Sequence, residues 1–209
     1  IIKNGPGERR RFIDMELCQI DKVYMYHLSN YNKILQQRNN LLKQININNS
    51  LIETLYIWDE QLVKYGSFII SRRIEFINLL NDIIKKIHYK LTGKKEKIKL
   101  LYDSNVLPNE YLSQLKKKRK IDIKNNVTSV GPHRDDICFN SNNIDIRKFG
   151  SQGQQRTAAL SLKLAEINIV EKIINEKPIL LLDDVLSELD SSRQNYLLEN
   201  IKNVQTIIT

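Results

Sequence analysis

Apolar residues recur at helical spacing through the N-terminal part of the chain. Leucine and isoleucine return every three or four positions, and between residues 8 and 91 there is no proline and Gly66 is the only glycine. This pattern predicts long amphipathic helices. The asparagine-rich stretch 46–50 is predicted to divide them into two, with Ser50 as N-cap of the second and Glu53 completing a capping box. Antiparallel packing of the two helices would bury their apolar stripes.

Beyond Gly93 the pattern changes to short segments of mixed type. Strand-like runs cover residues 97–102, 127–130, 136–139 and 144–146, and a helical piece follows Pro108. The pattern then predicts a helix at 152–175, an apolar strand at 179–182, a helix at 191–202 and a strand from Gln205. The chain is therefore predicted to have a mainly helical lobe at residues 1–125 and a partial α/β lobe at residues 126–209.

The charge is unevenly divided between these predicted lobes. The chain has a formal net charge of +9 at pH 7. Residues 127–209 carry nine Lys and Arg against eleven Asp and Glu, so the positive excess lies entirely in residues 1–126. Such an excess favours a surface that faces a polyanion such as DNA. The alternative is that the lysines reflect an AT-rich genome and form ordinary solvated faces.

Composition excludes several classes of protein. Cys18 and Cys138 are far apart in the sequence, so neither a disulfide framework nor a zinc site is predicted, and the reducing cytoplasm is the natural setting. No apolar run approaches the roughly 20 residues that span a bilayer, so a membrane protein is not expected. The chain begins at Ile1 and ends in the apolar stretch 206–209, and we interpret it as a fragment of a longer protein.

The strand predicted at residues 179–182 ends in two carboxylates, Asp183 and Asp184. A strand that is apolar on both faces belongs inside a parallel sheet, and acids at its carboxyl end emerge where such sheets bind ligands. In this Walker B pattern Asp183 would hold Mg²⁺ and Asp184 would activate the water that attacks a phosphate. The alternative is a buried strand with an acidic cap. The turn from Ser187 to Asp190 favours an ATPase, because ABC ATPases carry a Ser-x-Leu-Asp turn, the D-loop, at this place.

A polar helix start precedes the Walker B pattern. Segment 150–156 puts a hydroxyl, a glycine and free amides at a helix N-terminus, where backbone N–H groups and the helix dipole attract anions. The segment resembles the ABC signature Leu-Ser-Gly-Gly-Gln, from which it departs at Gly150 and Gln152. The candidate nucleotide-binding residues are Ser151, Gln152, Gly153 and Gln154. After the D-loop, Ser191 is the predicted N-cap of the next helix, with Gln194 three positions on.

Four segments together resemble the RecF family of bacterial DNA-repair ATPases of the ABC/SMC type. They are residues 4–14, 130–136, 150–157 and 182–190, and the resemblance runs from end to end of the chain. It implies an α/β ABC-type ATPase lobe, here partial and representing its C-terminal half, with a mainly α-helical second lobe. It also implies that ATP and Mg²⁺ bind between two subunits, that ATP drives homodimerisation, and that the protein acts with RecR and RecO at gapped DNA in recombinational repair and replication restart.

The resemblance also implies roles for the candidate residues. Asp183 holds Mg²⁺, Asp184 takes the catalytic position, and Ser151 with the amides near Gly153 contacts the γ-phosphate bound by the partner subunit. Ser187 and Asp190 form the D-loop. The 209 residues contain no Gly-x-x-x-x-Gly-Lys-Ser/Thr loop, so slow ATP hydrolysis is expected of the full-length protein and none of this chain alone. An incomplete α/β lobe is also expected to expose apolar surface on its sheet.

The weaker candidates are basic residues and a histidine turn. The candidate DNA contacts are Arg9, Arg10, Arg11, Lys116, Lys117, Lys118, Arg119 and Lys120. Pairing with nearby acids and simple solvation are their alternatives. His133 and Arg134 follow Gly131 and Pro132, and both a structural and a functional role stay open for them. A second hypothesis for the whole is a non-enzymatic DNA-binding or scaffold module of the SMC-like class.

Overall fold

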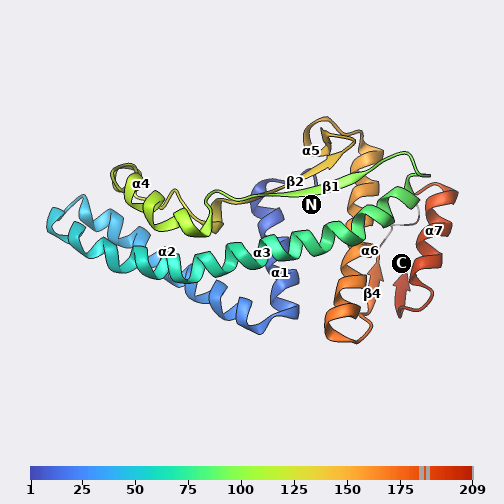
Figure 1. Ribbon diagram of the computed structural model, residues 1–209, viewed down its shortest axis with the longest axis horizontal. Helices are drawn as coiled ribbons and strands as arrows, with labels where there is room; N and C mark the ends of the chain where they lie inside the picture. The colour runs from blue at the N-terminus through green and yellow to red at the C-terminus, as the bar shows by residue number, and fades with distance from the viewer. Residues whose placement is uncertain (184–185, 187–188, 209) are drawn as a thin grey trace. The chain divides into compact units, whose positions relative to one another are not determined.

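The computed structural model describes residues 1–183, 186 and 189–208, except for the side chain of Ser192, and it divides into two compact units. The helical unit comprises residues 4–76 and 102–137, and the sheet unit comprises residues 1–3, 77–101 and 138–209. Figure 1 follows the elements of both from blue at the N-terminus to red at the C-terminus. This division differs from a single cut after residue 125, because residues 77–101 belong with the sheet unit.

Helices build most of the helical unit. Its elements are α1 (Pro6–Ile20), α2 (Lys22–Ile45), η1 (Asn49–Thr54), the first part of α3 (Leu55–Leu91), η2 (Pro108–Glu110), α4 (Tyr111–Asn125) and η3 (Pro132–Arg134). The predicted break after α2 is confirmed, but the predicted capping box of Ser50 and Glu53 is wrong. The Asn48 side chain accepts a hydrogen bond from the Ser50 amide at 3.2 Å, and a 3₁₀ helix fills the gap. A short local hydrogen bond of this kind competes with a helix cap.

Asp21 separates α1 from α2, and the hydrophobic pattern does not predict this break. Its Oδ1 accepts hydrogen bonds from the amides of Val23 and Tyr24 at 2.9 and 3.0 Å, so it caps α2. Its Oδ2 accepts a hydrogen bond from Arg72 Nε at 2.9 Å, which ties the cap to α3.

Residues 127–130 form a loop, so the predicted strand is wrong. The Thr128 amide donates to Asn39 Oδ1 at 2.8 Å, and the Ser129 amide donates to Asp122 Oδ1 at 3.1 Å. Because side chains satisfy these amides, the segment can be buried without a neighbouring strand. The alternating pattern marks its burial correctly, since Thr128 and Val130 are both buried.

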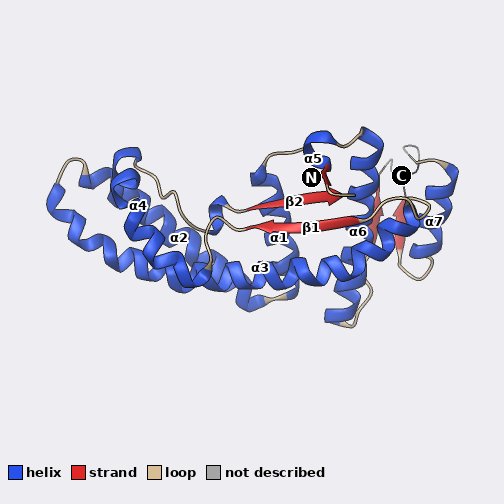
Figure 2. Ribbon diagram, turned by 45° about the horizontal axis from the view of Figure 1, so that its top comes forward, coloured by secondary structure: helices blue, strands red, loops and turns tan. Residues whose placement is uncertain are grey.

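The sheet unit contains most of two small sheets and the helices that follow them (Figure 2); residues 102–103 of the first strand and 136–137 of the second belong to the helical unit. Strands β1 (Ile98–Asp103), β2 (Asp136–Ser141) and β3 (Ile144–Asp145) lie in that order, with β2 and β3 antiparallel. Strands β4 (Leu180–Leu182) and β5 (Thr206–Ile208) pair in parallel. The helices after β3 are α5 (Ile146–Phe149), α6 (Gln152–Ile174) and α7 (Ser191–Ile201). The strands and helices predicted beyond residue 136 are confirmed to within about two residues.

Helix α6 supplies much of the core of the sheet unit, and its buried side chains include Leu160, Leu162, Leu164, Ala165 and Ile169. Apolar residues are exposed near the β4–β5 pair, as predicted, with 62% of Ile179 and 70% of Leu181 accessible. None of the helices in the described ranges combines the length and the apolar character needed to cross a membrane.

Candidate functional site

The predicted signature segment forms a sharply capped helix start. Ser151 is the N-cap of α6: its Oγ accepts a hydrogen bond from the Gln154 amide at 3.2 Å, and Gln154 Oε1 accepts one from the Ser151 amide at 2.9 Å. This is a complete capping box. Gln152 and Gly153 occupy the first turn, where backbone amides have no acceptor within the helix, and both residues are exposed. The structure therefore presents amides, a hydroxyl and the positive end of the α6 dipole to solvent.

Local backbone geometry explains why glycine stands at position 150, where the common signature has leucine. It ends α5, and its amide donates to Ile146 O at 3.2 Å. A Cβ at this position would lie 2.6 Å from Ile146 O, closer than real Cβ atoms approach. The two-residue connection between α5 and α6 therefore requires glycine here.

Glu96 fixes this helix start from outside the motif. Its Oε1 accepts a hydrogen bond from Gln154 Nε2 at 3.2 Å, and its Oε2 accepts one from Ser141 Oγ at 3.0 Å. The same Oε2 lies 3.6 Å from Nε2 of the buried His88. One carboxylate thus links the capping box of α6 to the end of β2 and to α3. Sequence reasoning missed Glu96, whose only visible signal is that it is a lone acid within a run of lysines.

His88 continues this polar chain into the core of the sheet unit. Ser161 Oγ donates to Thr157 O at 2.7 Å, so it accepts a hydrogen bond from His88 Nδ1 at 2.9 Å. Burial lowers the pKa of His88, although the Glu96 carboxylate opposes that shift. The imidazole is therefore held neutral, with its proton on Nδ1.

Asp183 follows β4 at the carboxyl end of a parallel strand pair, as the Walker B pattern predicts for its position, and it is exposed. Asp184, the predicted catalytic residue, lies outside the described residues. Within the described ranges no cluster of three or more His, Cys, Asp or Glu side chains could enclose a metal ion. A single carboxylate still fits Mg²⁺, because this ion is usually held by one or two carboxylates together with phosphates and water.

Asp190, predicted in the D-loop, is the N-cap of α7. Its side chain accepts a hydrogen bond from the Arg193 amide at 2.9 Å and forms an ion pair with the Arg193 side chain at 3.2 Å. The predicted N-cap, Ser191, is therefore wrong by one residue. Gln194 Nε2 donates to the carbonyls of Leu186 and Leu189 at 2.8 and 3.1 Å, which ties these two residues to α7. Ser187 lies outside the described residues.

The three arginines at the start of α1 differ in exposure. Arg9 is 4% exposed, and its Nε and Nη2 donate to the two Asp136 oxygens at 2.6 and 3.0 Å. Arg10 donates to the Asp135 carbonyl at 2.8 Å and is partly buried, whereas Arg11 is exposed. Arg9 therefore has a structural partner, and Arg11 is the most accessible of the three to DNA.

The basic run on α4 is also mixed in character. Lys116, Lys117, Lys118 and Lys120 are exposed. Arg119 donates to Asp59 Oδ2 at 2.7 and 3.1 Å and packs against the helical unit. At helical spacing Lys116 and Lys117 share a face with Lys120, whereas Lys118 lies on another side of α4.

His133 and Arg134 belong to a hydrogen-bonded cluster inside the helical unit. Tyr31 OH donates to His133 Nδ1 at 2.7 Å, and His133 Nε2 donates to the Thr128 carbonyl at 2.9 Å. Arg134 Nη2 donates to the same carbonyl at 3.2 Å. Burial lowers the pKa of His133 to about 4. Both ring nitrogens are thus engaged, which supports the structural role.

No family model matches the chain, but curated proteins match it along its whole length. It is 58% identical over 209 residues to the DNA replication and repair protein RecF of Lachnoclostridium phytofermentans and 57% identical over 209 residues to that of Agathobacter rectalis. RecF of Clostridium botulinum (strain Okra / Type B1) is 53% identical over 214 residues. In each comparison the match covers 100% of the chain and 58% of the relative. The chain thus spans little more than half the length of these relatives.

Solved structures give the same result. The recombination mediator protein RecF-ATP of the RecFOR pathway matches with a TM-score of 0.92 and 39% identity, over 100% of this chain and 58% of that one. The corresponding RecF-ATPγS structure matches with a TM-score of 0.91 and 39% identity, over 100% of this chain and 59% of that one. The predicted fold class, a partial α/β ABC-type lobe with a mainly helical second lobe, is confirmed.

Proposed function

Since the chain belongs to the RecF family, we propose that its full-length protein is an ATP-dependent DNA-binding protein of recombinational repair and replication restart. It dimerises on ATP in the cytoplasm and acts with RecR and RecO at gaps where single-stranded and duplex DNA meet. The observation that carries this proposal is the exposed, capped N-terminus of α6, whose first-turn amides can bind an anion.

In the proposed dimer each nucleotide is held by two subunits. Ser151 Oγ retains a proton that it can donate to the γ-phosphate bound by the partner, and the amides of Gln152 and Gly153 add two further donors. Asp183 would hold Mg²⁺, which supplies charge neutralisation of the phosphates. Asp184 and Ser187 take their proposed roles, water activation and D-loop contact, from the family resemblance alone.

This chain contributes only part of such a site. Its 209 residues include no Gly-x-x-x-x-Gly-Lys-Ser/Thr loop to cradle the β- and γ-phosphates. We therefore expect no ATP hydrolysis by the chain alone and slow hydrolysis by the full-length dimer.

The test is the affinity of the full-length protein for duplex and gapped DNA, measured by fluorescence anisotropy with and without ATP and Mg²⁺. The proposal expects tighter binding with ATP, and an affinity that falls with log salt at a slope near −0.9 for each phosphate contacted. A DNA affinity that ATP leaves unchanged would instead support the alternative, a non-enzymatic scaffold module.

A further inference from the structure

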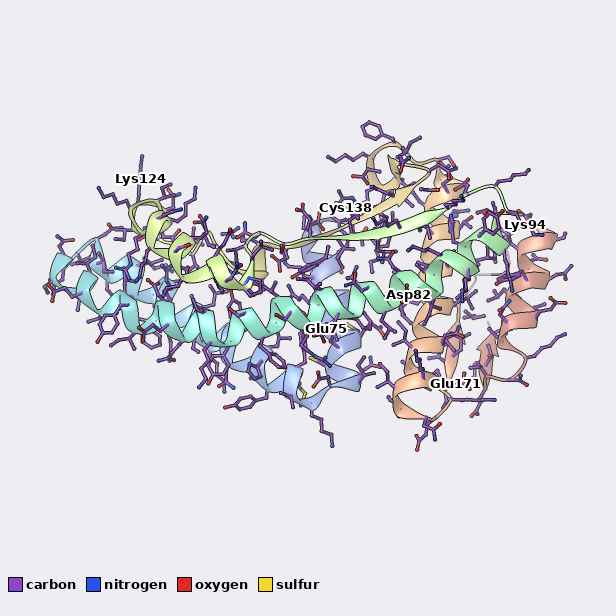
Figure 3. The ribbon with its side chains drawn as sticks, in the orientation of Figure 1. Glu75, Asp82, Lys94, Lys124, Cys138 and Glu171 are labelled. Carbon is purple, nitrogen blue, oxygen red and sulfur yellow. The ribbon has the colours of Figure 1, made fainter. Side chains whose placement is uncertain are left out.

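A basic groove lies wholly within the sheet unit, whereas every DNA candidate named from the sequence belongs to the helical unit. Its volume is about 830 Å³, and it is lined by the last turns of α3, by β1 and by the turn between β2 and β3. The residues that matter for its chemistry are Lys85, Lys86, Tyr89, Lys97, Lys99 and Asn142. Figure 3 labels Asp82 and Lys94, which mark the part of α3 beside the groove and the turn that leads to β1.

The charge of this groove is strongly one-sided. Residues 82–99 contain seven lysines and two acids, Asp82 and Glu96. The four lysines of the groove are exposed, and none of the ion pairs between described residues involves them. The Glu96 carboxylate accepts hydrogen bonds from Ser141 and Gln154, and the lysines outnumber the acids of this segment, so the groove keeps a positive excess. Several like charges held together favour an anionic ligand that neutralises them.

Hydrogen bonds fix the segments that carry these lysines against one another. Asn81 Nδ2 donates to Leu100 O and the Leu100 amide donates to Asn81 Oδ1, both at 2.8 Å, which fixes β1 against α3. The Lys97 amide donates to Asn142 Oδ1 and the Asn142 amide donates to Lys97 O, both at 3.0 Å, which fixes the β2–β3 turn against β1. Alternation along β1 places Lys99 on its exposed face, and Lys97, the residue before β1, is exposed as well.

The dipole at the C-terminal end of α3 does not by itself explain why the groove lysines cluster. Cations near a helix C-terminus are favoured by the helix dipole, and that accounts for Lys90 in the last turn. The effect fades within a turn and does not reach Lys97, just before β1, or Lys99 in β1. A ligand that contacts both the end of α3 and the β1 segment would account for all four groove lysines.

We propose that this groove binds the sugar-phosphate backbone of DNA. Lysine, asparagine and tyrosine side chains are among the groups that contact phosphate and sugar in protein–DNA complexes. Backbone contacts carry no sequence information, so the groove gives affinity without sequence preference. The inference rests on the proposed DNA-binding function and assigns it a surface in the sheet unit. Glu96 then lies between the two sites, one residue before Lys97 and in contact with Gln154 of the signature segment.

The experiment compares two variants of the full-length protein, each with four lysines replaced by glutamine. The groove variant is Lys85→Gln, Lys86→Gln, Lys97→Gln and Lys99→Gln. The matched control removes the same charge from exposed lysines of the helical unit, as Lys22→Gln, Lys33→Gln, Lys43→Gln and Lys64→Gln. Glutamine keeps the helix propensity and most of the side-chain length. Thermal unfolding of each variant checks that it remains folded.

Binding to duplex and to single-stranded DNA is measured over a range of salt concentrations. The groove variant is expected to bind at least about tenfold more weakly near 0.1 M salt, with a salt slope shallower by about 3 to 4, while the control keeps its slope within about 1. A loss in either DNA form supports the proposal and identifies the form bound. Equal losses in both variants, or a groove variant that binds like wild type, overturn it. A wild-type protein that binds no DNA would instead overturn the proposed function.

Discussion

Arg38 is the largest fully buried side chain among the described residues, and acids from two other helices surround it. Its Nε donates to Asp59 Oδ1 at 2.9 Å, and its Nη1 donates to Asp122 Oδ2 and to Thr128 Oγ1, each at 2.9 Å. All three charged side chains are 0% exposed. A buried ion pair depends on every member, because removal of one leaves the others charged and desolvated.

Arg38→Met is therefore expected to lower the free energy of unfolding by about 3–5 kcal/mol, since Asp122 would stay buried without its cationic partner and Asp59 would keep only Arg119. Urea denaturation of the full-length protein followed by circular dichroism measures this. Arg72→Met is the matched control, because the Arg72 side chain is 39% exposed in its pair with Asp21. Its expected loss is about 1 kcal/mol or less. Equal losses for the two variants would contradict the structural role of the Arg38 cluster.

At the scale of elements, three Ser-x-x-Glu/Gln patterns show what the sequence can and cannot predict. Only Ser151 with Gln154 forms a capping box. Asn48 accepts the hydrogen bond from the Ser50 amide that Glu53 would accept in a capping box, and Asp190 caps α7 one residue before Ser191. Neighbouring polar side chains compete for the same amides, and sequence spacing alone does not rank them.

The long elements are predictable because their apolar periods are long, and α6 matches its predicted range to one residue. The contacts that position the signature segment are not predictable in this way. Glu96 is 58 residues from Gln154 in the chain, and His88 is 73 residues from Ser161. A helical or strand period describes one element at a time, so it contains no information on such pairs.

Glu96→Gln tests this link between elements. A glutamine has one carbonyl oxygen where Glu96 has two, so only one of Gln154 Nε2 and Ser141 Oγ keeps an oxygen acceptor, and the charge-assisted character of both hydrogen bonds is lost. The free energy of unfolding is expected to fall by about 1–3 kcal/mol. Glu171→Gln, at an exposed position of α6 labelled in Figure 3, is expected to change it by at most about 0.5 kcal/mol. Chemical denaturation of both variants measures the difference. A Glu96→Gln variant as stable as this control would contradict the structural role of Glu96.

At the scale of the whole molecule, the histidines make stability depend on pH. The chain has three, and the structure lowers the pKa of each, with burial as the main cause. Above pH about 6.5 they are neutral in the folded and unfolded states and contribute nothing to the pH dependence. Below it the unfolded chain binds protons that the folded chain excludes, so stability falls as the pH falls.

For His133 this loss extends from pH about 6.5 to its folded pKa of about 4 and amounts to about 3 kcal/mol. Denaturation midpoints between pH 7 and 4.5 are expected to fall for the wild type and to fall less steeply for His133→Gln, which has no titrating ring. Parallel pH profiles for the two proteins would show that His133 is not held neutral.

A site shared between two subunits is the central claim, and Ser151 tests it most directly. Ser151→Asp and Ser151→Asn both keep an N-cap acceptor for α6, but only aspartate puts a negative charge where the partner's phosphate would lie. The measurement is the molar mass of the full-length protein by light scattering, with and without ATP and Mg²⁺. Wild type and Ser151→Asn are expected to become dimers with ATP, while Ser151→Asp stays a monomer of equal thermal stability. A Ser151→Asp protein that dimerises with ATP as readily as wild type would contradict the claim.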